Sequence, residues 1–230
     1  MNKTKNLRSR ILPLLFVPVL AAFGQEPGDY RVEGQVADAT FSGVIYMTDA
    51  LTRDTLASTE VKQGKYVFTG RVEKPRYALV FSRETRSGGA FILEPGQIVL
   101  QGTRQATGTG TPMNDEFQAF NRALLEIEAA LRENRKSGEA ARAEIVSLAG
   151  GMMAKHPDDV LGVLAVIRTV GLLDDAALLD LIEKAGSFVQ QQEPVARKKK
   201  ALLARIATAE GKKFTDFSAE YEGKRQSLSD

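Results

Sequence analysis

The stretch VKQGKYVFTGRVEKPRYALV, residues 61–80, decides how the first half of this chain folds. It contains one run rich in aromatic and β-branched residues at 65–72, and it opens a second run, RYALVFS, at 76–82. Residues of these types favour strands. A glutamine-glycine pair precedes the first run and a lysine-proline pair separates the two, and both pairs are typical of turns. The stretch therefore predicts two short strands joined by a turn.

Similar runs extend over residues 30–102, with further turn signals between them. No helix-length segment interrupts them, so a parallel sheet of strand–helix–strand units is not expected. Short strands at this spacing predict an antiparallel β-sandwich or barrel, which we place at residues 25–102. The other strand-like runs are YRVEGQV (30–36), GVIYMTD (43–49), TLASTEV (55–61), GAFILE (89–94) and QIVLQG (97–102).

The hydrophobic period changes after residues 103–111, a small and polar stretch that we interpret as a linker. Pro112 suits the first position of a helix. The apolar residues that follow step by three and four, which is the period of one helix face. They are Phe117, Phe120, Leu124, Ile127 and Leu131. This stripe also fits a heptad repeat, so a helix pair between subunits is the alternative to packing inside the chain. We favour packing inside the chain, because the stripe lasts only about two heptads.

Four more helices complete a small helical domain at residues 112–209. One covers 139–155, one follows the histidine-proline break at 156–157, Asp174 caps the next, and Pro194 opens the last. Short connections between such helices predict antiparallel neighbours. The expected core residues are Ile145, Leu148, Met152, Met153, Val160, Leu161, Leu164, Ile167, Leu178, Leu181, Ile182, Leu202, Leu203 and Ile206. The predicted fold class is α+β, with an N-terminal antiparallel β-sandwich or barrel followed by a small antiparallel helical domain.

Residues 1–24 have the three parts of a secretory signal peptide. Four basic residues come first, an apolar stretch spans 11–23, and small residues before Gln25 fit cleavage there. The alternatives are a membrane anchor or a buried helix, but the apolar stretch is short for a bilayer span and contains two prolines. We therefore expect an exported protein of the periplasm or cell envelope, with membrane contact only through the uncleaved leader.

Composition narrows the classes of function. The formal net charge of +2 falls to −2 once the four basic residues of the leader are removed, so no nucleic-acid partner is expected. The chain contains no cysteine, which excludes thiol chemistry, thiolate metal sites and lipoprotein attachment. Its hydrophobic fraction of 43% is that of a globular protein with a core of its own.

Few residues are candidates for a catalytic, metal-binding or ligand-binding site. His156 is the single histidine, and Asp158 and Asp159 do not have the spacing of a helical ligand pair, so we favour a helix–helix turn here. The stretch GTGTP at 108–112 lacks the further glycine and the Gly-Lys-Ser/Thr ending of phosphate-binding loops. The basic run at 197–200 is expected on a solvated face, with an anionic partner as the alternative. We predict no catalytic, cofactor-binding or metal-binding residue, and no cofactor.

Several short motifs, taken in order, resemble one family. The matching residues are Val61, Gly64, Phe68, Gly70 and Pro75; Glu94, Pro95 and Gly96; Gly108, Thr109 and Asn114; His156, Pro157 and Gly162; and Phe214, Asp216, Phe217, Gly223 and Leu228. The chain departs from the pattern at Ala57-Ser58, where the family often has Asp-Ser. The ordered set resembles the N-terminal domain of unknown function, with its following helical region, of thioredoxin-like proteins of the alkyl-hydroperoxide-reductase and thiol-specific-antioxidant (AhpC/TSA) type in the Gram-negative cell envelope.

The resemblance implies a thiol-disulfide oxidoreductase context, since relatives carry a Cys-X-X-Cys domain next. It implies that residues 210–230 are the truncated start of that thioredoxin-like domain, and we predict a β-hairpin there. No catalytic residue carries over, because this chain has no cysteine.

Three hypotheses about function follow. The first is a non-catalytic accessory or partner-recognition module of an envelope thioredoxin-like (thiol-disulfide oxidoreductase) protein, lacking the Cys-X-X-Cys domain. Its partner is a protein client or an envelope component. The alternative is a free-standing periplasmic binding protein for a peptide, glycan or apolar ligand. An enzyme that uses carboxylates is the third, and no constellation of residues supports it. The oligomeric state is left open.

Overall fold

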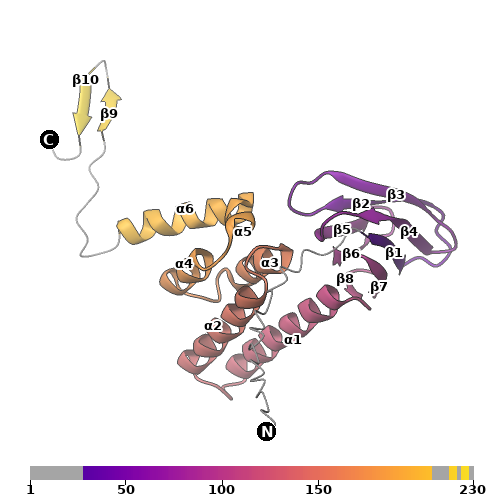
Figure 1. Ribbon diagram of the computed structural model, residues 1–230, viewed down its shortest axis with the longest axis horizontal. Coiled ribbons are helices and arrows are strands. Elements are labelled where there is room, and N and C mark those ends of the chain that lie inside the picture. The colour runs from indigo at the N-terminus through magenta and orange to yellow at the C-terminus, as the bar shows by residue number, and fades with distance from the viewer. Residues whose placement is uncertain (1–27, 209–217, 222–223, 228–230) are drawn as a thin grey trace, which may run out of the picture.

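The computed structural model describes residues 28–208, 218–221 and 224–227. A barrel-like sheet of eight strands comes first, and a group of helices follows it along the chain (Figure 1). This arrangement confirms the predicted α+β fold class. The predicted leader, residues 1–24, lies outside the described residues. The same is true of Phe214, Asp216, Phe217, Gly223 and Leu228 from the last family motif.

The eight strands form one sheet in the order β3-β2-β5-β6-β8-β7-β1-β4. Their bounds are β1 Gly28–Gln35, β2 Gly43–Asp49, β3 Thr55–Val61, β4 Lys65–Val72, β5 Arg76–Ser82, β6 Ser87–Leu93, β7 Gly96–Gln101 and β8 Ala106–Thr109. The outermost strands in this order, β3 and β4, follow each other along the chain and meet at a bridge between Lys62 and Lys65. The sheet therefore curls into a near-barrel rather than a sandwich.

Two strand pairs are parallel, whereas the sequence predicted antiparallel neighbours throughout. β1 runs parallel to β7, with Tyr30 opposite Gly96, and β6 runs parallel to β8, with Gly89 opposite Ala106. The other pairs of the barrel are antiparallel. Curling the sheet brings strands together that are distant in the sequence, and the direction of the chain then sets the sense of each pair.

Strand β8 corrects the interpretation of residues 103–111 as a linker. Residues 106–109 lie between β6 and β7 in the sheet, and Ala106 and Gly108 are buried. The strand has four residues and includes a glycine, so its local preference for extended structure is weak. Its hydrogen-bond partners come from the two flanking strands, which only the tertiary structure brings to it.

The pairing of β1 with β4 explains two glycines. The register places Tyr30 opposite Gly70 and Tyr66 opposite Gly34. A Cβ atom on Gly70 would lie 2.7 Å from the Tyr30 hydroxyl oxygen, and one on Gly34 would lie 2.5 Å from Cζ of Tyr66. Each ring therefore covers the glycine across from it, an arrangement that stabilises glycine in a sheet. Burial raises the pKa of Tyr66 to about 12.

Six helices follow the barrel within the described residues, one more than predicted. Their bounds are α1 Pro112–Arg132, α2 Gly138–Lys155, α3 Val160–Thr169, α4 Asp175–Glu183, α5 Ser187–Gln191 and α6 Glu193–Ala207. The additional helix, α5, has five residues, which is too short to show a helical period. Asp174 caps α4 as predicted, and Pro112 and Pro194 stand in the first turns of α1 and α6.

The helices share one hydrophobic core, which contains most of the predicted core residues. The prediction of burial was wrong for Leu131 and Leu203, which are 44% and 46% exposed. Leu148, Ile167 and Ile206 are half-buried. These five residues lie at the edges of their apolar stripes, where the position of the neighbouring helix decides burial. In the described part of the chain, no helix has the combined length and apolar character that crossing a membrane requires.

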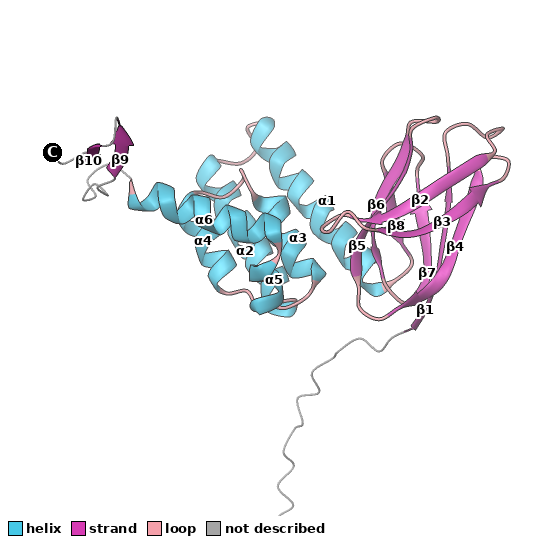
Figure 2. Cartoon of the chain, turned by 90° about the horizontal axis from the view of Figure 1, so that it is seen from above, coloured by secondary structure: helices cyan, strands magenta, loops and turns pink. Residues whose placement is uncertain are grey.

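Helix α1 connects the two parts by packing on the outside of the sheet, where it contacts β8 and β6 (Figure 2). Ile92 on β6 belongs to the helical core rather than to the barrel core. Its partner on β5 is Tyr77, whose ring meets that of Phe117 edge-on at 6.3 Å between centroids. One end of the outer face of the barrel is therefore covered by α1.

The predicted C-terminal hairpin is confirmed in its described part. β9 (Ser218–Tyr221) pairs antiparallel with β10 (Lys224–Ser227), with Tyr221 opposite Lys224. Among the described residues these two strands pair only with each other. Their assignment to a thioredoxin-like domain stays a prediction.

Candidate functional site

The joint between barrel and helices is built on one buried asparagine. Asn114 stands in the first turn of α1 and has no exposed surface. Its Oδ1 accepts a hydrogen bond from the Ile92 N–H at 2.9 Å, and its Nδ2 donates to the Ile92 carbonyl at 2.7 Å. Asn114 thus pairs with β6 as a neighbouring strand would, and it ties the helix to the sheet.

Glu94 caps the same helix from a distant position. It is almost completely buried, and its Oε1 accepts hydrogen bonds from the N–H groups of Met113 at 2.9 Å and Asn114 at 3.1 Å. These N–H groups have no partner inside the helix, and the N-cap residue Thr111 makes no capping bond through its side chain. Burial raises the pKa of Glu94, while the hydrogen bonds from Thr111, Asn114 and Met113 oppose the rise.

Gly108 on β8 completes the joint because it leaves room for the asparagine. A Cβ atom there would lie 2.6 Å from Cβ of Phe91 and would overlap Oδ1 of Asn114. Two motifs of the family resemblance therefore meet at one place, since Glu94 belongs to one of them and Gly108 and Asn114 belong to the other. Their role in this structure is to hold α1 at a fixed position on the barrel.

His156 lies between carboxylates from two helices. Its Nδ1 is 2.7 Å from Oδ2 of Asp159, and its Nε2 is 3.1 Å from Oε2 of Glu116. Glu116 belongs to α1, and it also pairs with Lys155 at 2.9 Å. The predicted helix–helix turn is confirmed. Sequence reasoning missed Glu116, because no local pattern connects residues that stand 40 positions apart.

The two carboxylates favour the protonated imidazole. The hydrogen bond to Asp159 raises the pKa of His156, burial opposes the rise, and Glu116 adds to it. Burial alone would raise the pKa of Glu116, but hydrogen bonds from Lys155 and His156 outweigh burial and lower it. Since the pKa of His156 in the folded state lies above 6.5, the ring contributes stability that is fully present below pH 6.5. That stability is lost as the pH rises through the raised pKa.

The two aspartates after His156 cap helices. Asp159 caps α3, where its Oδ1 accepts from the Leu161 N–H at 2.8 Å. Asp158 accepts from the Phe188 N–H at 2.6 Å, at the start of α5. Carboxylates at helix starts satisfy free N–H groups and the helix dipole, so both side chains have structural roles. Within the residues that the structure describes, no three or more His, Asp or Glu side chains are grouped so that they could hold a metal ion.

The remaining motifs also have structural places. In the basic run of α6, Arg197 pairs with Glu193 at 3.4 Å, and Lys199 donates to the side chain of Gln190 at 2.9 Å. Arg197 is exposed and Lys199 is half-buried, and side chains with such partners are those of a solvated helix face. Residues 108–112 lie at the end of β8 and in the turn into α1, where they belong to the joint.

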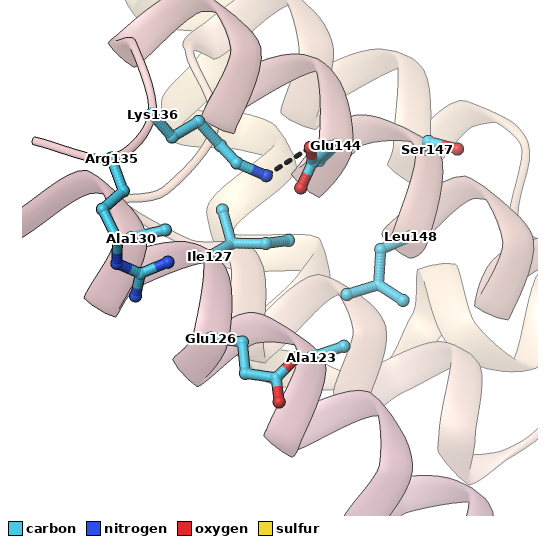
Figure 3. Close-up of a pocket in the computed structure, with 9 residues that line it drawn as sticks. All are labelled: Ala123, Glu126, Ile127, Ala130, Arg135, Lys136, Glu144, Ser147 and Leu148. Atoms are coloured by element: carbon cyan, nitrogen blue, oxygen red, sulfur yellow. Dashed lines mark ion pairs between the residues drawn. The ribbon is translucent and has the colours of Figure 1, made fainter.

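Helices α1 and α2 border an open groove of about 490 Å³ (Figure 3). Its floor is apolar and includes Ile127 and Leu148. Its rim carries both signs of charge, with Lys136 paired to Glu144. The predicted apolar stripe of α1 packs inside this chain from Phe117 to Ile127, as expected. The paired charges of the rim give the groove no preference for a ligand of either sign.

The outer face of the barrel carries an apolar patch on β2 and β5. Val44 and Tyr46 point outward from β2, and Leu79 and Phe81 point outward from β5, since each alternates with buried residues. They are 49%, 54%, 38% and 57% exposed, respectively. The register places Tyr46 directly opposite Phe81, and Val44 and Leu79 stand two residues from them along their own strands. We call them the β2–β5 patch.

The patch continues the surface on which α1 is seated. The outward residues of β5 are Tyr77, Leu79 and Phe81, and the helical core covers Tyr77. On the next strand, α1 covers Ile92. One apolar outer surface therefore runs from the joint to Phe81, and the helical part of the chain occupies one end of it.

A shallow trough of about 420 Å³ crosses β6 beside the patch. Phe81 forms one wall, the small residues Gly88 and Ala90 lie between, and Arg104 lines the other side. Phe81 stands opposite Gly88, and a Cβ atom on Gly88 would lie 3.1 Å from Cδ2 of the ring. The glycine thus keeps the trough open next to an exposed aromatic ring.

Sequence analysis did not single out the β2–β5 patch, although a signal was present. GVIYMTD and RYALVFS are apolar at successive positions, whereas strands with one solvated face alternate apolar with polar residues. Apolar residues on both faces are typical of strands that are covered on both sides. In this structure, α1 covers only part of that second face.

These features define an α+β protein in which a β-barrel is clamped to a helical unit by the first turn of a helix. Residues 30–117 match the family model of the Domain of unknown function (DUF4369). The match takes in strands β2–β8 and ends in α1, so it includes the joint at Asn114. No curated protein and no solved structure matches the chain.

Proposed function

We propose that this chain is a non-catalytic partner-recognition module that serves a thioredoxin-like protein of the Gram-negative cell envelope. The observation that carries the proposal is the β2–β5 patch. Contiguous apolar side chains that stay exposed on a folded surface mark sites of interaction. A rigid barrel holds these four side chains in place, so a partner would meet them already ordered.

The energy available at the patch is enough to support recognition. Fully burying a large apolar side chain contributes about 1.5–3 kcal/mol. Since the four side chains are already about half covered, burying the rest contributes on the order of 3–6 kcal/mol before the cost of association. Aromatic residues such as Tyr46 and Phe81 are enriched at interfaces for this reason.

The redox context rests on the order of the family motifs, and the envelope location rests on the leader-like residues 1–24. A protein without cysteine supplies no thiolate for disulfide exchange, so its contribution to such a system is to bind and position. The match of residues 30–117 to a domain family agrees with the part of the resemblance that covers the barrel.

Site-specific crosslinking in the native host tests the proposal. A photo-reactive phenylalanine analogue is placed at Tyr46, at Phe81 and, as a control, at Leu203, which is similarly exposed on α6. We expect crosslinks to one discrete protein from the two patch positions and none from the control. Equal crosslinking at all three positions, or none at the patch, contradicts the proposal.

Two further measurements test its other parts. Insulin reduction by dithiothreitol should proceed at the rate of the protein-free blank, and acceleration by the chain would contradict a non-catalytic role. Mass spectrometry of the native protein should show a start at Gln25, whereas an intact Met1 on a cytosolic protein would contradict export.

A further inference from the structure

We infer that the β2–β5 patch and its trough bind an acidic protein segment, one that inserts an apolar side chain beside Phe81 and sets carboxylates against the surrounding arginines. This inference rests on the proposed function and adds the chemistry of the partner. It is carried by the charges around the patch, by the shape of the trough, and by the way α1 already uses the same surface.

Arginines gather at one end of the patch. Arg83 and Arg86 stand in the turn between β5 and β6, and Arg104 stands in the turn between β7 and β8. The start of β6, next to the first turn, is bonded to the second turn, since the Gly88 N–H donates to the Thr103 carbonyl at 3.0 Å. Within the described residues, Arg86 and Arg104 form no ion pair and no hydrogen bond.

The acids near this end offset the charge of Arg83, which interacts with Glu84, but not the charges of Arg86 and Arg104. Glu84 lies in the same turn as Arg83, and it accepts a hydrogen bond from Ser82 at 3.1 Å. Glu60, on the strand next to Val44, is paired with Lys62 at 2.9 Å. The end of the patch therefore has an excess of positive charge, and an acidic partner would complement it.

The shape of the trough favours a protein segment over a membrane surface. A flat bilayer needs an apolar, cationic face but no recess. Here the small residues Gly88 and Ala90 leave a hollow between Phe81 and Arg104 that can receive a side chain. Guanidinium groups pair with carboxylates through two parallel hydrogen bonds, which adds geometric specificity at the rim.

The chain itself shows how this surface accepts a partner. At the other end of the same outer face, α1 places Phe117 against Tyr77, and its Asn114 bonds to the backbone of Ile92. That contact combines an apolar side chain with adjacent polar groups. The free end of the face offers the same combination, with arginine donors in place of a strand backbone.

A phage library of random linear peptides, panned against the full chain, tests the inference. We expect the enriched peptides to contain aromatic or aliphatic residues flanked by Asp and Glu. Their affinity should fall about tenfold or more in Phe81→Ser and in Arg104→Glu, and it should weaken as salt shortens the reach of exposed charges. The matched controls Leu203→Ser and Lys200→Glu, both on exposed positions of α6, should bind as the parent does.

The outcomes distinguish failure of the acidic-partner inference from failure of the proposed function. Enriched peptides that are neutral or basic, yet lose binding in Phe81→Ser, overturn the acidic partner and leave the proposed function standing. No enrichment, or binding that ignores both patch variants, overturns both. Sedimentation with phosphatidylglycerol vesicles that depends on Phe81 and occurs without peptide enrichment overturns the inference in favour of a membrane. Should Phe81→Ser fail to fold by circular dichroism, Tyr46→Ser replaces it.

Discussion

The substitution Asn114→Ala should weaken the attachment of helix α1 to the barrel and lower the free energy of unfolding. In the native structure the Asn114 side chain satisfies both the N–H and the carbonyl of Ile92, at 2.9 Å and 2.7 Å. It also donates to Thr111 at 2.8 Å. Because Asn114 is fully buried, water does not replace these partners. The variant therefore leaves two backbone groups of β6 without hydrogen bonds in the interior.

The magnitude follows from the number of orphaned groups. A buried donor or acceptor without a partner costs about 1–3 kcal/mol, so two such groups cost about 2–6 kcal/mol. A single domain is stable by about 5–15 kcal/mol, so this loss is a large fraction of the total. The control is Asn121→Ala on the same helix, where the side chain accepts one exposed hydrogen bond from Arg168. That change should cost about 0.5 kcal/mol or less.

Urea unfolding followed by circular dichroism measures the total loss, and amide hydrogen exchange locates it. Protection should fall in β6 and in the first turns of α1, while α4 and α6 keep theirs. A loss below about 1 kcal/mol, or one equal to that of the Asn121 control, would show that the asparagine is not what holds the joint.

Four further outcomes are expected. As the pH rises from 6.5 through the raised pKa of His156, the free energy of unfolding of the parent should fall relative to that of His156→Gln. Parallel pH curves for the two proteins would refute the role of the carboxylates that pair with His156. Gly34→Ala should destabilise by about 1–3 kcal/mol because its Cβ displaces the buried Tyr66 ring. Gly150→Ala inside α2, with open space around it, should stabilise by about 1 kcal/mol; equal effects of the two changes in thermal unfolding would contradict this account. Backbone amides of β9 and β10 should exchange with near-zero protection while those of β4 stay protected, because an isolated two-stranded hairpin is only marginally stable in water. Equal protection of the two regions would show that the hairpin is integrated into the fold.

Local signals in the sequence located most of the elements. The predicted strands at 43–49, 55–61, 65–72 and 76–82 coincide with β2, β3, β4 and β5. The reason is that β-branched and aromatic runs between turn-forming residues carry their own structural preference. Helix caps are equally local, and Asp174 lies where it was expected.

Sequence analysis did not find the elements that lack a local signal. β8 and α5 are each five residues long or shorter, and their neighbours supply the contacts that stabilise them. The parallel pairs β1–β7 and β6–β8 depend on how the barrel curls, which no short stretch records. Glu116 reaches His156 only because α1 packs against the turn between α2 and α3.

The amino-acid sequence by itself determined the α+β class, the order of strands before helices and the absence of thiol chemistry, because composition and period are properties of the chain alone. The tertiary structure decided what the apolar outer face of the barrel does. Tyr77 and Leu79 have the same outward direction on β5, yet α1 covers the first and leaves the second exposed. Exposure depends on what packs nearby, and the clamp at Asn114 sets where α1 lies and therefore where the open patch begins.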